Sequence, residues 1–393
     1  MRLSRLLLRW LPAQLLKQSV GQLDSSLPFT KNKAYTFGPP SNLRIRPLEC
    51  ARMLGSKFFL RDLHRVCLVV VVDFEFLEVL FDRLNLGRIK DVLMGAYHRF
   101  GPGRPPFNPL SLLRFKVILA LKGYRSQRAL EREIRVDSRV RRLCGFDEKV
   151  PSHSTIVRFE RRIGFERVKK LIGHVIEELV SCGFIKGLKV VLDSKPLEAR
   201  CRRDPRDPSR GWLDREARLG RGARGLVMGY KVHLACDGEA EMPLAFRVAP
   251  ANENEKRHAA ALLNEAAEVV RVETIVCDRQ YSSRRIRDFI RGLGAEPVIP
   301  YPKNQKKGIK GLLRVDKKFR VHGPERLRRL YRLKSAVERV NSRLATLIGK
   351  ITFKGLKAAV TQVSYAILAM LFIAQTAIKT GKPDKARSIT YYV

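Results

Sequence analysis

Acidic residues are scarce in this sequence relative to basic ones. The 393 residues include 38 Asp and Glu against 78 Lys and Arg, which leaves a formal net charge of +40 at pH 7. Hydrophobic residues make up 45% of the chain, a normal share for a folded protein. The composition therefore excludes an acidic disordered chain, and at roughly 150 residues per domain the length predicts two or three domains. The charge predicts a polyanionic partner.

Cysteine is also sparse, and its spacing carries no pairing signal. The seven cysteines are odd in number and scattered, with no C-x-x-C pair and no histidine at zinc-finger spacing. This pattern excludes a small disulfide scaffold and a structural zinc site. We expect reduced thiols in a cytoplasmic protein.

Long apolar runs are few. Residues 1–16 are interrupted by three arginines, which argues against a signal peptide, and residues 66–72 are too short to cross a bilayer. Residues 358–378 contain no charge and are long enough to span a membrane. Five polar side chains in this stretch favour a buried core helix, with a membrane anchor as the alternative.

The chain divides by pattern into four parts. We expect a poorly defined basic arm over 1–55, a helical domain over 56–183, an α/β domain over 184–380 with an Arg-rich insertion at 200–225, and a tail over 381–393. Helix starts are marked by Asn108-Pro109, Ser126, Asp137-Ser138 and Pro151-Ser152. Strands are expected at 188–192, 230–236, 243–248, 273–277 and 297–300, with helices at 255–270 and 283–293. The fold class is α/β, with a mixed sheet, an antiparallel hairpin at Asp237-Gly238 and flanking helices.

Two aspartates directly follow apolar strands. Asp193 comes after Val190-Val191-Leu192, and Asp278 comes after Ile275-Val276-Cys277. Side chains at the carboxyl ends of neighbouring parallel strands converge on one crevice, so we expect the two carboxylates to be adjacent. Taken singly, each aspartate is more simply a turn or cap residue.

A third carboxylate, Glu338, lies in a basic helix. Tyr331, Lys334, Glu338 and Asn341 recur at three- and four-residue steps, so we expect them on one helical face, with an apolar face packed on the sheet. The simpler interpretation is an exposed ion pair between Lys334 and Glu338.

Three clustered carboxylates need a cation to offset their repulsion. Hard oxygen ligands select Mg²⁺ or Mn²⁺, and two such ions about 4 Å apart are a known arrangement for attack on a phosphodiester. The sequence therefore predicts Asp193, Asp278 and Glu338 as catalytic and metal-binding residues, with DNA as the partner.

Several blocks resemble the cut-and-paste DDE transposases of bacterial and archaeal insertion sequences, in the branch with a Tyr-Arg-Glu-Lys signature. The blocks are Pro105-Pro106-Phe107-Asn108-Pro109, residues 124–131, residues 151–159, Leu192-Asp193-Ser194, Gly229-Tyr230-Lys231-Val232-His233, Cys277-Asp278-Arg279-Gln280-Tyr281 and Val337-Glu338-Arg339-Val340-Asn341.

This resemblance covers about residues 85–378 and implies an RNase H-like catalytic core with Asp193, Asp278 and Glu338 as its triad. Tyr331 and Lys334 match signature positions, but Lys334 stands where Arg is usual and Ala345 where a final Lys is expected. The family also implies a homodimer that joins element ends to target DNA, in the cytoplasm at the nucleoid.

Basic segments outline the expected DNA surface. Residues 200–225 hold nine Arg against four acidic residues, and residues 303–320 hold eight Lys or Arg against Asp316. The module at 108–163 has a helix-turn-helix pattern. Side chains expected to contact DNA are Tyr331, Lys334, Arg158, Arg161, Arg162, Arg202, Arg203, Lys231, Lys306 and Lys307.

The functional prediction is a DNA transposase that cleaves strands at insertion-sequence ends and transfers them into target DNA. The alternative is a catalytically impaired, transposase-derived DNA-binding protein, because Ala345 departs from the signature. A membrane-associated protein anchored by residues 358–378 is a third hypothesis.

Overall fold

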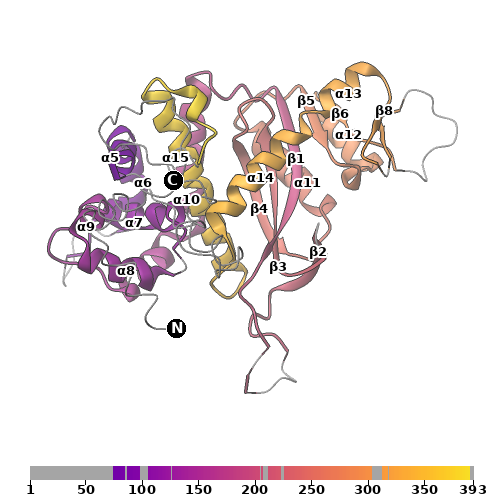
Figure 1. Ribbon diagram of the computed structural model, residues 1–393. Coiled ribbons are helices and arrows are strands. Elements are labelled where there is room, and N and C mark those ends of the chain that lie inside the picture. Colours follow the sequence, from indigo (N-terminus) through magenta and orange to yellow (C-terminus); the bar gives the residue numbers. More distant parts are fainter. Residues whose placement is uncertain are drawn as a thin grey trace, which may run out of the picture. The chain divides into compact units, whose positions relative to one another are not determined.

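The computed structural model is shown in Figure 1. The residues that the structure describes are 74–84, 86–97, 105–124, 126–203, 205–206, 211–222, 225–302, 312–316 and 318–389. The expected N-terminal arm, the apolar runs at 1–16 and 66–72, and the lysines Lys306 and Lys307 lie outside these ranges.

Helices occupy the described chain before residue 182. They are α5 (Phe74–Arg83), α6 (Leu86–Met94), α7 (Pro109–Leu121), α8 (Gln127–Val136), α9 (Ser138–Leu143) and α10 (His153–Ser181). The predicted helix starts are confirmed for three of them, because the side chains of Asn108, Ser126 and Asp137 accept hydrogen bonds from the first-turn amides of α7, α8 and α9. Gly164, at φ 66° and ψ 174°, interrupts α10, which is therefore two consecutive helical pieces.

A six-stranded mixed sheet follows. Its strands are β1 (Lys189–Glu198), β2 (Arg218–Gly222), β3 (Gly225–Asp237), β4 (Pro243–Pro250), β5 (Thr274–Cys277) and β6 (Glu296–Val298). The order is β2-β3-β1-β5-β6, and β4 pairs with β3. β1 is antiparallel to β3 and parallel to β5, which is parallel to β6. This confirms the expected mixed sheet with an antiparallel hairpin, while β2 was not predicted.

Helices cover both faces of the sheet. The remaining elements are α11 (Lys256–Ala267), η2 (Arg279–Tyr281), α12 (Arg284–Gly292), β7 (Arg314–Val315), β8 (Val321–His322), α13 (Glu325–Tyr331), α14 (Lys334–Ile348), α15 (Leu356–Lys379) and η4 (Pro383–Lys385). Asp193 contacts α14, whereas the next residue, Ser194, contacts Glu255 at the start of α11. Since successive strand side chains point to opposite faces, α14 and α11 lie on opposite sides of β1. Figure 1 shows α14 running across the strands.

The long apolar helix α15 is a core element. Residues Val363 to Ala377 are buried along its whole circumference, and it packs against α7 and α10 as well as β4 and α14. Among the described residues it is one helix long and apolar enough to cross a membrane, but two thirds of its most apolar window is buried inside the protein. The expectation of a core helix over 358–378 is supported by this packing. The same packing joins the helices to the sheet, so the domain limit at residue 183 stays a prediction.

Candidate active site

Strand pairing brings the two aspartates side by side. Leu192 of β1 is the parallel partner of Cys277 of β5, so Asp193 and Asp278 are the next residue on each strand. Asp278 follows the end of β5, as predicted. Asp193 was expected at a strand end, but β1 continues to Glu198 because antiparallel β3 still pairs with it. Asp193 therefore lies at the point along β1 where the pairing with parallel β5 ends.

Helix α14 carries the third carboxylate to this edge. Its apolar residues Val337, Val340, Leu344 and Leu347 are buried, as the periodicity predicts. Asn341 Nδ2 donates to Asp193 Oδ2 at 3.3 Å, which fixes the helix against β1. Glu338, with 59% of its side chain exposed, faces the solvent side of the cluster.

An ammonium group links the acids. Lys334 Nζ lies 3.3 Å from Glu338 Oε1 and 3.7 Å from Asp278 Oδ2. The expected Lys334–Glu338 ion pair is therefore present, and it includes Asp278 as well. Three carboxylates from β1, β5 and α14 thus face one cation supplied by the chain itself.

Tyr331 reaches the same cluster from another helix. Its hydroxyl donates to Asp278 Oδ1 at 3.4 Å. The expectation that Tyr331 shares the helical face of Lys334 and Glu338 is wrong, because α13 ends at Tyr331 and a turn at Arg332 and Leu333 precedes α14. Its burial and the neighbouring Asp278 raise the pKa of Tyr331 and keep the phenol protonated.

Burial dominates the electrostatics of Asp193. It raises the pKa of Asp193 to about 6, against the opposing attraction of Lys334, and the charges of Asp278 and Glu338 add to the rise. Burial alone would lower the pKa of Lys334, but Asp278, Asp193 and Glu338 together raise it. The lysine therefore remains charged at neutral pH and partly neutralises the cluster.

The side chains at this site offer the type of donor atom that a hard divalent cation binds. Asp193, Asp278 and Glu338 offer carboxylate oxygens, and Asn341 Oδ1 beside them is buried with no hydrogen-bond partner in the described chain. In their present arrangement, no three His, Cys, Asp or Glu side chains within the described ranges lie close enough together to hold an ion. Lys334 instead supplies the positive charge, so ion binding requires these side chains to rearrange around it.

The predicted DNA-contacting side chains separate into exposed and buried ones. Arg158, Arg161 and Arg162 are exposed on α10, and so are Arg202 and Arg203. The guanidinium of Arg162 lies over a tyrosine ring, 4.6 Å from its centroid. These five arginines remain available to a polyanion.

The structure corrects the expectation that Lys231 contacts DNA. Its residue exposure is 7%, and Nζ contacts Glu255 Oε1 at 2.7 Å and the carbonyl of Glu253 at 2.9 Å. Ser194 shares the same carboxylate oxygen at 3.3 Å. Lys231 lies on the α11 face of the sheet and stabilises the interior there, because its ammonium is already paired and covered.

Sequence reasoning missed a second cluster that holds α14. Glu241, in the β3–β4 turn, is 7% exposed and adopts a left-handed φ of 58°. Its carboxylate accepts from Arg339 Nε at 2.8 Å and from Arg343 at 3.2 Å. Arg339 follows Glu338 directly, so this contact fixes the helix rotation at the candidate site. No local pattern marks Glu241, because its partners lie about a hundred residues later.

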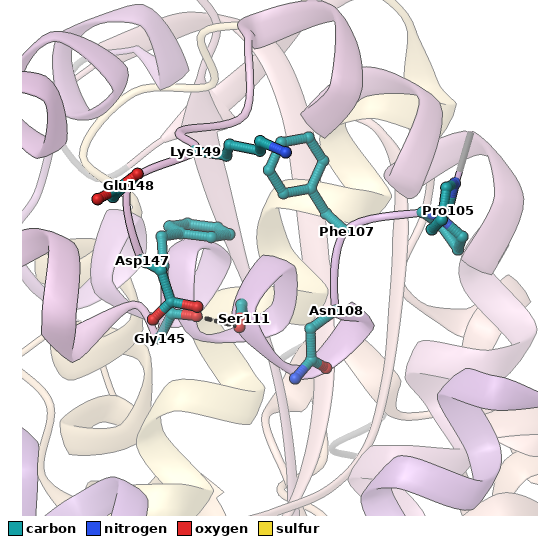
Figure 2. Close-up of a pocket in the computed structure, with 10 residues that line it drawn as sticks. Pro105, Phe107, Asn108, Ser111, Gly145, Asp147, Glu148 and Lys149 are labelled. Carbon is teal, nitrogen blue, oxygen red and sulfur yellow. Dashed lines mark hydrogen bonds between the residues drawn. The ribbon is translucent and has the colours of Figure 1, made fainter.

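One cleft in the described chain is separate from the carboxylates. It has a volume of about 650 Å³ and is lined by the segments 105–108 and 145–149 with Ser111 of α7. Figure 2 shows Phe107, Asn108 and Lys149 around it, with the Ser111 hydroxyl donating to the Gly145 carbonyl at 2.7 Å. It belongs to the helical region and lacks the acid cluster, so cleft size does not locate the chemistry here.

Comparisons with known proteins identify the family of the chain. The family model "Transposase DDE domain" matches residues 186–372, and the model "Transposase domain (DUF772)" matches residues 71–162. The sequence matches none of the curated proteins. A piggyBac transposase synaptic complex with hairpin DNA is 12% identical, with 83% of this chain and 77% of that chain covered and a TM-score of 0.39.

Two Mos1 transposase structures are also similar, a paired-end complex with the left transposon end and a paired-end complex with Mn. They are 17% and 16% identical, cover 65% and 64% of this chain and 73% and 72% of theirs, and have TM-scores of 0.18. These weak structural similarities add nothing to the two family models. Since those models cover both the helices and the sheet with its carboxylates, the chain belongs to the DDE-type transposases of the insertion-sequence kind, enzymes that cleave and transfer DNA strands.

Proposed function

We propose that this transposase cuts DNA at the ends of its insertion sequence and joins the freed strands to target DNA, with Asp193, Asp278 and Glu338 as the catalytic carboxylates. The observation that carries the proposal is the pairing of Leu192 with Cys277, which sets the two aspartates together, while Lys334 links Asp278 to Glu338.

The three carboxylates would hold Mg²⁺ or Mn²⁺, two ions in the family's arrangement. Bound to these carboxylates, the metal would supply activation of the attacking oxygen and neutralisation of charge at the leaving oxygen. Lys334 and Tyr331 lie at the same edge with donor groups, so they are placed to position a phosphate once the carboxylates turn to the metal.

The DNA path proposed here runs over the exposed arginines. Arg158, Arg161 and Arg162 in the helical region would bind the element ends, and Arg202 and Arg203 would contact DNA from the Arg-rich insertion that follows β1. Lys306 and Lys307 belong to the same proposal from sequence alone. Because two ends must be joined together, we propose a homodimer on DNA, acting at the cytoplasmic nucleoid.

Strand cleavage tests the assignment. Asp193→Asn, Asp278→Asn and Glu338→Gln should each abolish Mg²⁺-dependent nicking of DNA that carries the sequences flanking the gene, while DNA binding is retained. Asp288→Asn is the matched control, because Asp288 is 54% exposed and pairs with Arg284 and Arg291 of its own helix, α12. Nicking that persists in all three variants would show that these carboxylates are not the catalytic ones.

A second candidate function is a DNA-binding protein that no longer transposes. It is favoured by Ala345, which replaces the expected signature lysine on α14. Lys350 is the next lysine along the chain and pairs with Glu198 at the end of β1. Mg²⁺-dependent nicking by the unmodified protein would exclude this candidate.

A further inference from the structure

A short hairpin between β6 and α13 presents an aromatic ring to solvent. Its strands are β7 and β8, and Phe319 lies in the turn between them. Phe319 is 86% exposed, the highest value among the large hydrophobic residues of the described chain. Its φ of 59° lies in the left-handed region that a phenylalanine rarely adopts.

The turn is held in this conformation by Asp316. The backbone amides of Lys318 and Arg320 donate to Asp316 Oδ1 at 2.7 Å and 3.0 Å, and the Phe319 amide donates to the Asp316 carbonyl at 3.2 Å. His322 Nε2 lies 3.3 Å from the other carboxylate oxygen. A strained residue persists where its surroundings determine it, and such positions concentrate at binding sites.

The base of the hairpin is joined to the candidate active site. The Tyr301 amide, after β6, donates to the Leu313 carbonyl at 2.9 Å, which closes the hairpin onto the sheet edge. The chain then enters α13, which Arg326 ties to Glu296 of β6 by two hydrogen bonds of 2.6 Å. The last residue of α13, Tyr331, contacts Asp278. The hairpin that carries the ring is thus followed in the chain by the helix whose last residue contacts Asp278.

Exposed cations lie next to the ring in the sequence. Lys318 and Arg320 flank Phe319 and are exposed, and further along the chain Arg328 of α13 and Arg332 in the turn after it are also exposed. An aromatic face between cations suits a nucleic-acid strand, in which phosphates alternate with flat bases. The other strongly exposed apolar side chain on a hairpin, Leu226 of β3 at 70%, has no flat face.

We infer that Phe319 stacks on an unpaired base of the DNA strand that enters the candidate active site, with Lys318 and Arg320 on the adjacent phosphates. The inference rests on the proposed function and specifies which form of DNA the site prefers. A base within intact duplex is already stacked on both faces, so the ring gains little there. The protein should therefore prefer DNA with an unpaired base near the cut position.

Binding of the full chain to two duplexes tests this preference. One is fully paired, and the other has the same sequence with 2-aminopurine opposite an abasic site. Phe319→Asn keeps the turn, since Asn tolerates the left-handed conformation, and removes the ring. We expect on the order of ten-fold weaker binding to the unpaired-base duplex, unchanged binding to the paired duplex, and loss of the fluorescence quenching that stacking produces. Phe319→Trp should restore all three, and Leu226→Asn should change none.

Each outcome of this binding experiment leads to a different conclusion. Equal preference and equal quenching in the wild type and Phe319→Asn would overturn the stacking inference and leave the proposed function standing. Failure of the wild type to bind either duplex would overturn both. Self-association that Phe319→Asn abolishes, with no change in DNA preference, would identify the ring as a contact between copies of the chain and would also overturn the inference.

Discussion

Replacement of Asp193 by Asn should stabilise the metal-free protein while it destroys activity. The carboxyl is largely covered between β1 and α14, and burial raises its pKa to about 6 from an ordinary value of 3.8. A raised pKa means that the folded protein holds this proton more tightly than the unfolded chain does. The ionised form therefore opposes folding at neutral pH, and a neutral amide of the same shape removes that cost.

The size and pH window follow from the same shift. About two pKa units correspond to at most ~3 kcal/mol at ~1.4 kcal/mol per unit. The folded state binds more protons than the unfolded state between about pH 4 and pH 6, so this contribution to stability falls as pH rises through that window. Asp193→Asn should match the wild type below about pH 4 and exceed it by up to ~3 kcal/mol at pH 8, or roughly 4 °C in Tm for a chain of this length.

Thermal and urea unfolding in EDTA at pH 4, 6 and 8 measure this difference. Asp288→Asn serves as the control, because its exposed carboxylate has no burial cost to lose. Mg²⁺ should raise the wild-type Tm at pH 8 and leave Asp193→Asn unchanged, since ligand binding stabilises only a protein that retains its site. An Asp193→Asn protein no more stable than wild type at pH 8, or equally stabilised at pH 4, would refute the reasoning.

Three further substitutions probe the frame around the site. Lys231→Met should lower the free energy of unfolding by about 3 kcal/mol in urea, because the largely covered Glu255 carboxylate loses its cation and keeps only the Ser194 hydroxyl, while DNA affinity stays the same. Weaker DNA binding by the fully folded variant would show that Lys231 contacts DNA after all. Glu241→Gln should lower the free energy of unfolding by about 3 kcal/mol, because Arg339 and Arg343 of α14 lose their carboxylate partner. Thermal melts followed by circular dichroism that match the wild type would contradict this. Gly187→Ala should cost about 3 kcal/mol by the same melts, because φ is 71° and the added carbon would lie 2.1 Å from Val270; a neutral effect would show that the turn relaxes.

Local chemistry in the sequence determined most element positions. The Asn108, Ser126 and Asp137 caps depend on side chains that bond their own helix amides, so they can be recognised without tertiary information. The apolar runs before Asp193 and Asp278 likewise predict buried strands, and side chains that follow neighbouring parallel strands converge at one end of the sheet. The block that contains Glu338 follows the two aspartate blocks in the order found in the family, and this order identified Glu338 as the third carboxylate.

Contacts across long sequence separations were decided only by the tertiary structure. Whether a lysine faces DNA or the interior depends on a partner that the fold supplies, and for Lys231 that partner is Glu255. Two other features depend on such contacts. Lys334 reaches Asp278 as well as Glu338, and Glu241 binds the arginines of α14. Periodicity in the sequence indicates which face of a helix or strand is apolar. It does not indicate which charged side chains pair, because the energy of an ion pair depends on a distance and a degree of burial that several segments set together.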